Sequence, residues 1–420
     1  MMRVSHRRLL AALLLGVAAA ARGEEFRFDA AEFERKPYEL GGWTELKQDH
    51  YALNPPGALY RLNYFGAPQR ATLDATTGIV ELTGKLRHEG ATLDLHTHSD
   101  LRHDQFGTVR SHAMYEAALS LRASPGITAE VGKRTLRWGK GYAFNPIGFV
   151  ERPKDPTDPD LAREGLVMVN ADLIANFDGP LQTVALTPVL LPVNGRLNSG
   201  FGLPGHLNPT LKLYALYSDT DIDLAWQARG SRPARLGADF ARNLTTNFEI
   251  HGEWARVLDA ARPVTDAAGQ VRTFTGNTTS WLFGARYLNE YDTTFIVEYY
   301  RNGGGYDGAQ LRDFYRFADA APVLKAIGLA QAAYGKPNPG RDYLYLRAQQ
   351  KDAFGIVYFQ PAVTVLANAD DRSFQLAPEL VYTGIANTEL RLRAYLLGGG
   401  AGTDFGEKAN ARRIEAYVKV

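Results

Sequence analysis

The last eleven residues of the chain, 410–420, alternate between polar and apolar side chains. The apolar members are Ile414, Ala416, Val418 and Val420, and the polar members are Arg413, Glu415, Tyr417 and Lys419. Because successive side chains of a β-strand point to opposite faces, this segment predicts a strand with one apolar face and one polar face. Such a strand constrains the fold, since its two faces need different surroundings.

Segments with the same alternation recur along the chain, which is typical of a wall that is apolar on one side and hydrated on the other. They include 59–64, 82–87, 93–98, 167–173 and 389–396. Short turns are predicted at 123–125, 178–180, 219–221, 243–246, 289–292, 351–354 and 383–387. Longer connections are predicted at 138–165, 193–208, 230–233, 258–278, 303–340, 367–370 and 398–409. This alternation of connections indicates antiparallel hairpins whose short turns share one end.

The N-terminal segment has the pattern of an export signal, because basic residues precede an apolar run over 9–20 and small residues follow. We predict a secretory signal peptide over 1–23 and a single domain over 24–420. The apolar run is shorter than the roughly 20 residues of a membrane helix, and no second run of that length follows. A helical membrane protein is therefore excluded.

The composition argues against several classes of function. The chain has 47 basic and 46 acidic residues, so a basic surface for nucleic acid is not expected. It has no cysteine, which excludes disulfides, thiolate catalysis and covalently attached c-type haem. No nucleophile elbow, P-loop or dinucleotide motif occurs, so we expect no enzyme, no cofactor and no catalytic residue. Glu249, His251 and Glu253 share a strand face, and we expect polar lining there, with a metal site or a proton relay as the less favoured alternative.

Taken together, the export signal, the repeated alternation and the terminal strand resemble those of a bacterial outer-membrane β-barrel. In that family an even number of antiparallel strands closes on itself, and the closing C-terminal strand is read by the insertion machinery. The resemblance implies an all-β transmembrane barrel of about 18 strands, within a range of 16–20, with long extracellular loops and a short helical insert. A soluble solenoid or sandwich is the alternative fold, but no fixed repeat is found.

The segment 132–160 has a more specific likeness. It runs from Gly132-Lys133-Arg134 through Trp138-Gly139 into an Asn145-Pro146 loop. This pattern resembles porin-like barrels of the alginate-export and capsule-assembly kind. It implies a strand that leads into a long ordered loop, and it does not identify a solute.

Two inserts are candidates for narrowing a barrel. In 138–165 four prolines restrict the backbone, so this loop either folds inward as a constriction or lies in solvent with hydrated charges. In 303–340 we predict helices over 309–318 and 323–334, which form either a lid over the pore mouth or a surface loop. The candidate lumen and constriction residues are Arg152, Lys154, Asp155, Asp158, Asp160, Arg163, Arg347, Arg391, Arg393, Glu249, His251 and Glu253.

These features predict an outer-membrane, porin-like channel through which a polar solute, anionic or saccharide-like, diffuses without a chemical step. The alternative is an occluded barrel that serves as a scaffold for a surface-polysaccharide or periplasmic electron-transfer partner. An outer-membrane enzyme that uses His251 is a third hypothesis. The expected partners are the lipid bilayer, lipopolysaccharide, the barrel-insertion machinery and a small polar solute, while a homo-oligomer or a periplasmic partner stays open.

Overall fold

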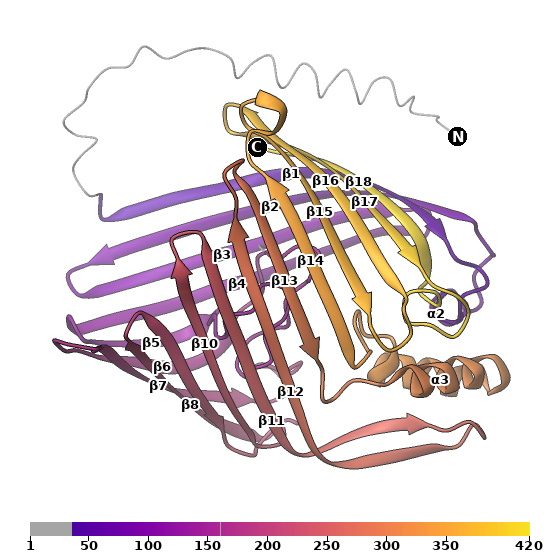
Figure 1. The fold of residues 1–420 in the computed structure, drawn as a ribbon, viewed down its shortest axis with the longest axis horizontal. Helices are drawn as coiled ribbons and strands as arrows, with labels where there is room; N and C mark the ends of the chain where they lie inside the picture. The colour runs from indigo at the N-terminus through magenta and orange to yellow at the C-terminus, as the bar shows by residue number, and fades with distance from the viewer. Residues whose placement is uncertain (1–35, 160) are drawn as a thin grey trace.

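The computed structural model describes residues 36–159 and 161–420, and within them the chain forms one closed antiparallel β-barrel of 18 strands (Figure 1). Each strand pairs with its neighbour in sequence, and β1 pairs with β18 to close the wall. The predicted fold class and strand number are thereby confirmed. The predicted signal peptide and Asp160 lie outside the described residues.

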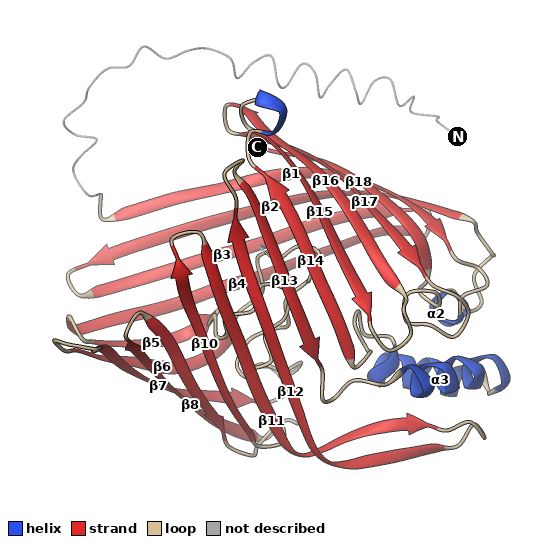
Figure 2. Cartoon of the chain, in the orientation of Figure 1, coloured by secondary structure: helices blue, strands red, loops and turns tan. Residues whose placement is uncertain are grey.

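The strands account for most of the described residues (Figure 2). They are β1 (Tyr38–Leu53), β2 (Thr72–His88), β3 (Ala91–Asp104), β4 (Gly107–Ser124), β5 (Ile127–Arg134), β6 (Leu166–Asn176), β7 (Leu181–Val193), β8 (His206–Tyr217), β9 (Thr220–Gln227), β10 (Arg235–Thr245), β11 (Phe248–Thr265), β12 (Val271–Leu288), β13 (Thr293–Arg301), β14 (Asp342–Gln350), β15 (Phe359–Asn368), β16 (Phe374–Ile385), β17 (Thr388–Gly398) and β18 (Asn410–Lys419). The helices are α2 (Ala58–Asn63), α3 (Gly308–Ala320) and α4 (Val323–Leu329), followed by a π-helical turn η2 (Ala330–Tyr334), and a short 3₁₀ turn η3 (Ala353–Gly355) precedes β15. Within the described ranges, none of the helices has the length and apolar character needed to cross a lipid bilayer.

The two ends of the barrel differ in the connections that they carry. The end that carries the short turns, here called the turn end, also holds the start of β1 and the end of β18. The opposite end, the loop end, carries the long connections, the helices α2, α3 and α4, and the two-residue turn between β3 and β4. One predicted long loop is wrong: most of 258–278 continues the ladder of β11 and β12, from Ala260 opposite Gly276 to Thr265 opposite Val271. A bulge after Val257 lets this hairpin project beyond the wall.

The strands place apolar side chains outside and polar side chains inside. On β17, Leu392 and Leu396 are exposed on the outer face, whereas Arg393 and Tyr395 are buried on the inner face. The same alternation on β2 exposes Leu82 and Leu86 and buries Glu81. The lumen is therefore the place where the charged side chains of the wall gather.

A helical cluster covers part of the loop end. The predicted helices of the 303–340 insert are present as α3, α4 and η2, and an Asp307 capping box begins α3. The expected strand over 59–64 is wrong, because these residues form α2, which packs on α3 and α4. Arg61 consequently pairs with Asp319 of α3 and does not line the wall.

Candidate functional site

The connection between β5 and β6, residues 135–165, enters the barrel, and we call it the lumen loop. Its backbone and side chains contact inward-facing residues of β11, β13 and β17, which lie on the far wall from β5 (Figure 1). Of the two predicted alternatives for 138–165, the structure therefore has the inward-folded loop. The site consists of this loop and the walls that hold it.

Two buried carboxylates hold the first half of the lumen loop by accepting backbone hydrogen bonds. Oε1 of Glu253 accepts from the N–H groups of Lys140 at 2.7 Å and Gly141 at 2.6 Å, and its Oε2 accepts from Ile147 at 3.2 Å. Glu298 accepts from the N–H groups of Tyr142 and Ala143. Both carboxylates are almost fully buried, and hydrogen bonds to buried charged groups are among the stronger ones in proteins.

Gly139 makes this close approach possible. Its φ is +87°, a conformation that favours glycine, and a Cβ atom at this position would lie 2.6 Å from Oε1 of Glu253. The Trp138-Gly139 pair noted in the sequence therefore lies where the chain, after β5 has ended at Arg134, turns onto the Glu253 carboxylate.

Apolar packing holds the same loop against one side of the wall. Trp138, Ile147, Phe149 and Val150 are buried within the barrel. They pack on inward-facing residues of β6, β7, β9 and β11, namely Leu166, Met168, Val189, Leu191, Val193, Ala225 and Ala255, together with Phe201 of the β7–β8 loop. Phe144 extends the contact to the other side, where it stacks on Tyr300 with ring centroids 4.4 Å apart. The loop thus fills a large part of the lumen with a small hydrophobic core.

The second half of the lumen loop is held by charges. Asp158 faces Arg393, with Oδ2 and Nη1 3.3 Å apart, and Arg391 at 3.8 Å. Within the loop, Arg163 pairs with Glu151 at 2.9 Å, and Glu151 also accepts from the backbone N–H of Trp138. Burial raises the pKa of Glu151, and the nearby Arg163 guanidinium opposes that shift. These contacts brace the loop between the β17 wall and its own first turn.

The arginines of the wall opposite the loop core are largely neutralised. Glu379 of β16 lies at the centre of this group and pairs with Arg393, with Arg347 at 3.2 Å and with Arg391 at 3.6 Å. Arg413 of β18 pairs with Asp49 of β1 at 2.8 Å and with Glu415. The predicted lumen arginines of β14 and β17 therefore belong to an ion-paired network and are not an uncompensated row of cations.

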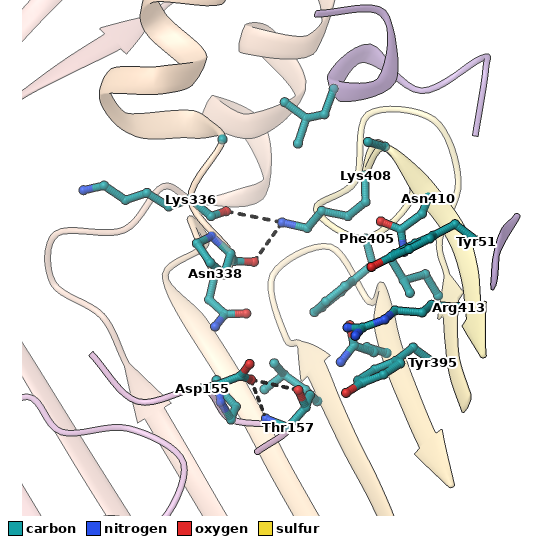
Figure 3. A pocket seen from close by; sticks show the side chains of 18 of the residues that line it. Tyr51, Asp155, Thr157, Lys336, Asn338, Tyr395, Phe405, Lys408, Asn410 and Arg413 are labelled. Atoms are coloured by element: carbon teal, nitrogen blue, oxygen red, sulfur yellow. Dashed lines mark hydrogen bonds between the residues drawn. The ribbon is translucent and has the colours of Figure 1, made fainter. Parts of the chain in front are cut away.

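Two cavities border the lumen loop. The outer cavity, of about 600 Å³, lies at the loop end between residues 153–157, residues 335–338 and the wall formed by β1 and β15–β18 (Figure 3). The inner cavity, of about 510 Å³, lies deeper, between the loop and His96 of β3 and Glu116 of β4. Lys154 lines both cavities, so its side chain stands where they meet.

The side chain of Lys154 forms no ion pair with any described residue, and its ammonium group donates to the backbone oxygen of Gly141. Burial lowers the pKa of Lys154, and the carboxylates of Glu253 and Glu151 oppose the shift. Arg137 on the same loop is exposed to the inner cavity and also has no ion pair among residues 36–159 and 161–420. Arg137 and Lys154 are therefore cations that border the cavities without an ion pair in the described structure.

His251 occupies a sealed position and not an accessible one. Its imidazole is buried, with Nε2 3.0 Å from Oε1 of Glu298 and Nδ1 3.5 Å from Oε1 of Glu249. Tyr142 of the lumen loop covers it with ring centroids 5.4 Å apart. Within the described part of the chain, no group of three or more His, Asp or Glu side chains is arranged to hold a metal ion.

The structure brings the predicted site residues together in three groups. Lys154, Asp155, Asp158, Arg152 and Arg163 lie on the lumen loop, where Arg152 pairs with Glu164. The second group is Arg347, Arg391 and Arg393, and the third is Glu249, His251 and Glu253. Sequence reasoning missed the anchoring role of Glu298 and the packing of the loop's apolar residues. The apolar residues Trp138, Phe144, Ile147, Phe149 and Val150 were the available signal, since they need an interior to pack in.

Comparison with known proteins supports the fold. No protein-family model matches the chain, and no curated protein matches it in sequence. The crystal structure of Pseudomonas aeruginosa OccK5 (OpdH) matches with a TM-score of 0.52 at 11% identity, covering 91% of this chain and 97% of that one. The chain shares the β-barrel fold of that structure. A variant of Rh. blastica porin also matches, with a TM-score of 0.45 at 12% identity over 91% of this chain and 99% of that one.

Proposed function

We propose that this porin-like barrel is an outer-membrane channel that lets a polar solute diffuse through a lumen narrowed by the lumen loop. The observation that carries the proposal is the position of the lumen loop, which crosses the barrel and leaves two cavities that both have Lys154 in their lining. The proposal contains no chemical step, because the channel acts by steric and electrostatic filtering.

The outer surface supports a place in a bilayer. Exposed aromatic side chains lie at two heights, with Trp226 and Trp254 toward the loop end and Tyr217 and Tyr287 toward the turn end. On the β11–β12 ladder, Trp254 and the Phe248–Tyr287 pair are six residues apart, a separation of roughly 20 Å at the rise of a strand. Aromatic girdles on either side of an apolar band are a property of outer-membrane barrels.

The charges of the two cavities support a weak preference for anions. The arginine network on β14, β17 and β18 is balanced by Glu379, Glu415 and Asp49. Arg137 and Lys154 remain without an ion pair in the described structure, and both face the path. These two cations would attract a passing anion, and they would repel a passing cation only modestly.

The test is the conductance of purified protein in a planar lipid bilayer, compared with a variant in which residues 139–162 are replaced by a short Gly-Ser linker. The proposal predicts single-channel current steps for the natural chain and steps several times larger for the variant. Shortening the tip of the β11–β12 hairpin, residues 266–270, which lines neither cavity, is the matched control and should leave the conductance unchanged.

A second candidate function is that of an occluded barrel, which acts as a scaffold for a surface-polysaccharide or periplasmic partner. The observation behind it is the apolar core that the lumen loop forms on β6–β11. Natural protein that inserts into the bilayer but carries no current would support the scaffold and contradict the channel.

A further inference from the structure

The outer cavity contains polar groups that the protein itself does not use. Asn338, Gln375 and Asn410 line it from the β13–β14 insert, β16 and β18. Among the described residues, none of these three side-chain amides forms a hydrogen bond. Each amide offers two N–H donors and a carbonyl acceptor, so the three together can both donate to and accept from hydroxyl groups.

Aromatic side chains face these amides across the cavity. Figure 3 shows Asn338 on one side and Tyr395, Phe405 and Tyr51 on the other. The Arg413 guanidinium lies against two of the rings, 4.9 Å from the Tyr395 centroid and 5.4 Å from the Tyr51 centroid. The rings are therefore fixed in place. Phe405 and Tyr395 are buried at 3% and 7% exposure, so the partly exposed Tyr51 ring offers the accessible apolar surface beside the hydrogen-bonding groups.

Three charged residues of the outer cavity are engaged within the protein, whereas Lys154 and Lys336 form no ion pair with any described residue. Arg413 pairs with Asp49 and Glu415, and Lys408 pairs with Asp404 at 2.9 Å. The Lys408 ammonium also donates to the backbone oxygen of Pro337 at 2.8 Å. Asp155 accepts from the hydroxyl and the backbone N–H of Thr157. These pairs leave hydroxyl recognition as the main capacity of the cavity, with Lys154 at its floor.

We propose that the outer cavity is a binding site for a carbohydrate of mono- or disaccharide size, which it holds before the solute passes Lys154. This inference rests on the proposed channel and names the class of its solute. A sugar ring combines hydroxyl groups at its edge with an apolar C–H face, which matches the amides on one side and the Tyr51 ring on the other. The volume of about 600 Å³ lies within the usual range for small-molecule sites.

The test uses maltose as the probe, in two measurements on the full-length protein. In a planar bilayer, maltose should reduce the ion current with saturable concentration dependence. In detergent, isothermal titration with maltose should give the same dissociation constant. A polyethylene glycol of similar mass, which lacks sugar hydroxyls, should show no saturation.

The double variant Asn338→Ala with Gln375→Ala should raise the half-saturating concentration about tenfold, because two neutral hydrogen bonds are lost. Neither side chain is bonded in the described structure, so the fold should not change. The matched control is Gln105→Ala, which removes an exposed amide at the β3–β4 turn outside the cavity and should leave the block unchanged.

The outcomes separate the two proposals. Ion current that maltose does not block, or a block that the double variant leaves unchanged, overturns the carbohydrate site and keeps the channel. Saturable binding in detergent by a protein that carries no current overturns the channel and supports the site.

Discussion

Replacing Glu253 by alanine should release the lumen loop from the wall. The substitution removes the acceptor for three backbone N–H groups, those of Lys140, Gly141 and Ile147. An unsatisfied buried donor costs about 1–3 kcal/mol. Three of them weaken the attachment by roughly 3 kcal/mol or more, which multiplies the population of released loops by roughly 150.

The barrel wall should survive this change, because its strands are closed by the ladder of backbone hydrogen bonds and not by the loop. We therefore expect single-channel recordings of the variant to show a larger mean conductance and frequent transitions between levels. Limited proteolysis should cut within 139–162 in the variant and not in the natural chain.

The matched control is Glu81→Ala. Glu81 is another buried carboxylate of the inner wall, but it binds the imidazoles of His96 at 2.6 Å and His98 at 2.7 Å and does not contact the loop. Both variants lose one negative charge, so a difference between them reports the loop attachment. Equal conductance, noise and protease resistance in the Glu253 variant and the natural chain would refute the reasoning.

Three further substitutions test other parts of the account. Gly132→Ala should lower thermal stability more than Gly107→Ala. Both glycines have φ near +130°, but only at Gly132 would a Cβ atom meet a backbone oxygen, that of Ala117 at 2.2 Å. Equal changes in the temperature at which the folded band on a gel converts to the unfolded band would contradict this. Arg393→Ala leaves Glu379 buried with weaker partners and should lower stability by about 3 kcal/mol in the same assay. Arg316→Ala, which removes an exposed ion pair, should leave stability almost unchanged. A negligible loss of stability at Arg393 would argue against the ion-paired network. Arg137→Gln should move the reversal potential in a potassium chloride gradient toward cation preference, while Arg196→Gln on an exposed loop should not; an unchanged potential would remove Arg137 from the path.

The strands were predictable because the alternation of polar and apolar side chains that specifies them lies within a few neighbouring residues. Alternation over 389–396 places Leu392 and Arg393 on opposite faces, and the structure has the leucine outside and the arginine inside. Closure followed from the even number of strands and the amphipathic last strand, which pairs with β1. Such patterns depend only on the spacing of neighbouring residues.

Features fixed by distant contacts were not predictable. Residues 59–64 alternate like a strand, yet Glu407 caps the first turn of α2 with its side chain, 2.6 Å from the Ala58 N–H, and with its backbone oxygen. A helix of six residues is marginal by itself, so contacts with α3 and α4 decide its conformation. In the same way, the inward fold of the lumen loop depends on Glu253, more than one hundred residues further along the chain.

The central claim is that solutes pass through the barrel beside Lys154. Since the chain contains no cysteine, Lys154→Cys would introduce its only thiol. Reaction of this variant with a bulky thiol reagent during a single-channel recording should abolish the current in discrete steps, while Gln105→Cys should continue to conduct. Undiminished current through the fully labelled Lys154 variant would contradict the account.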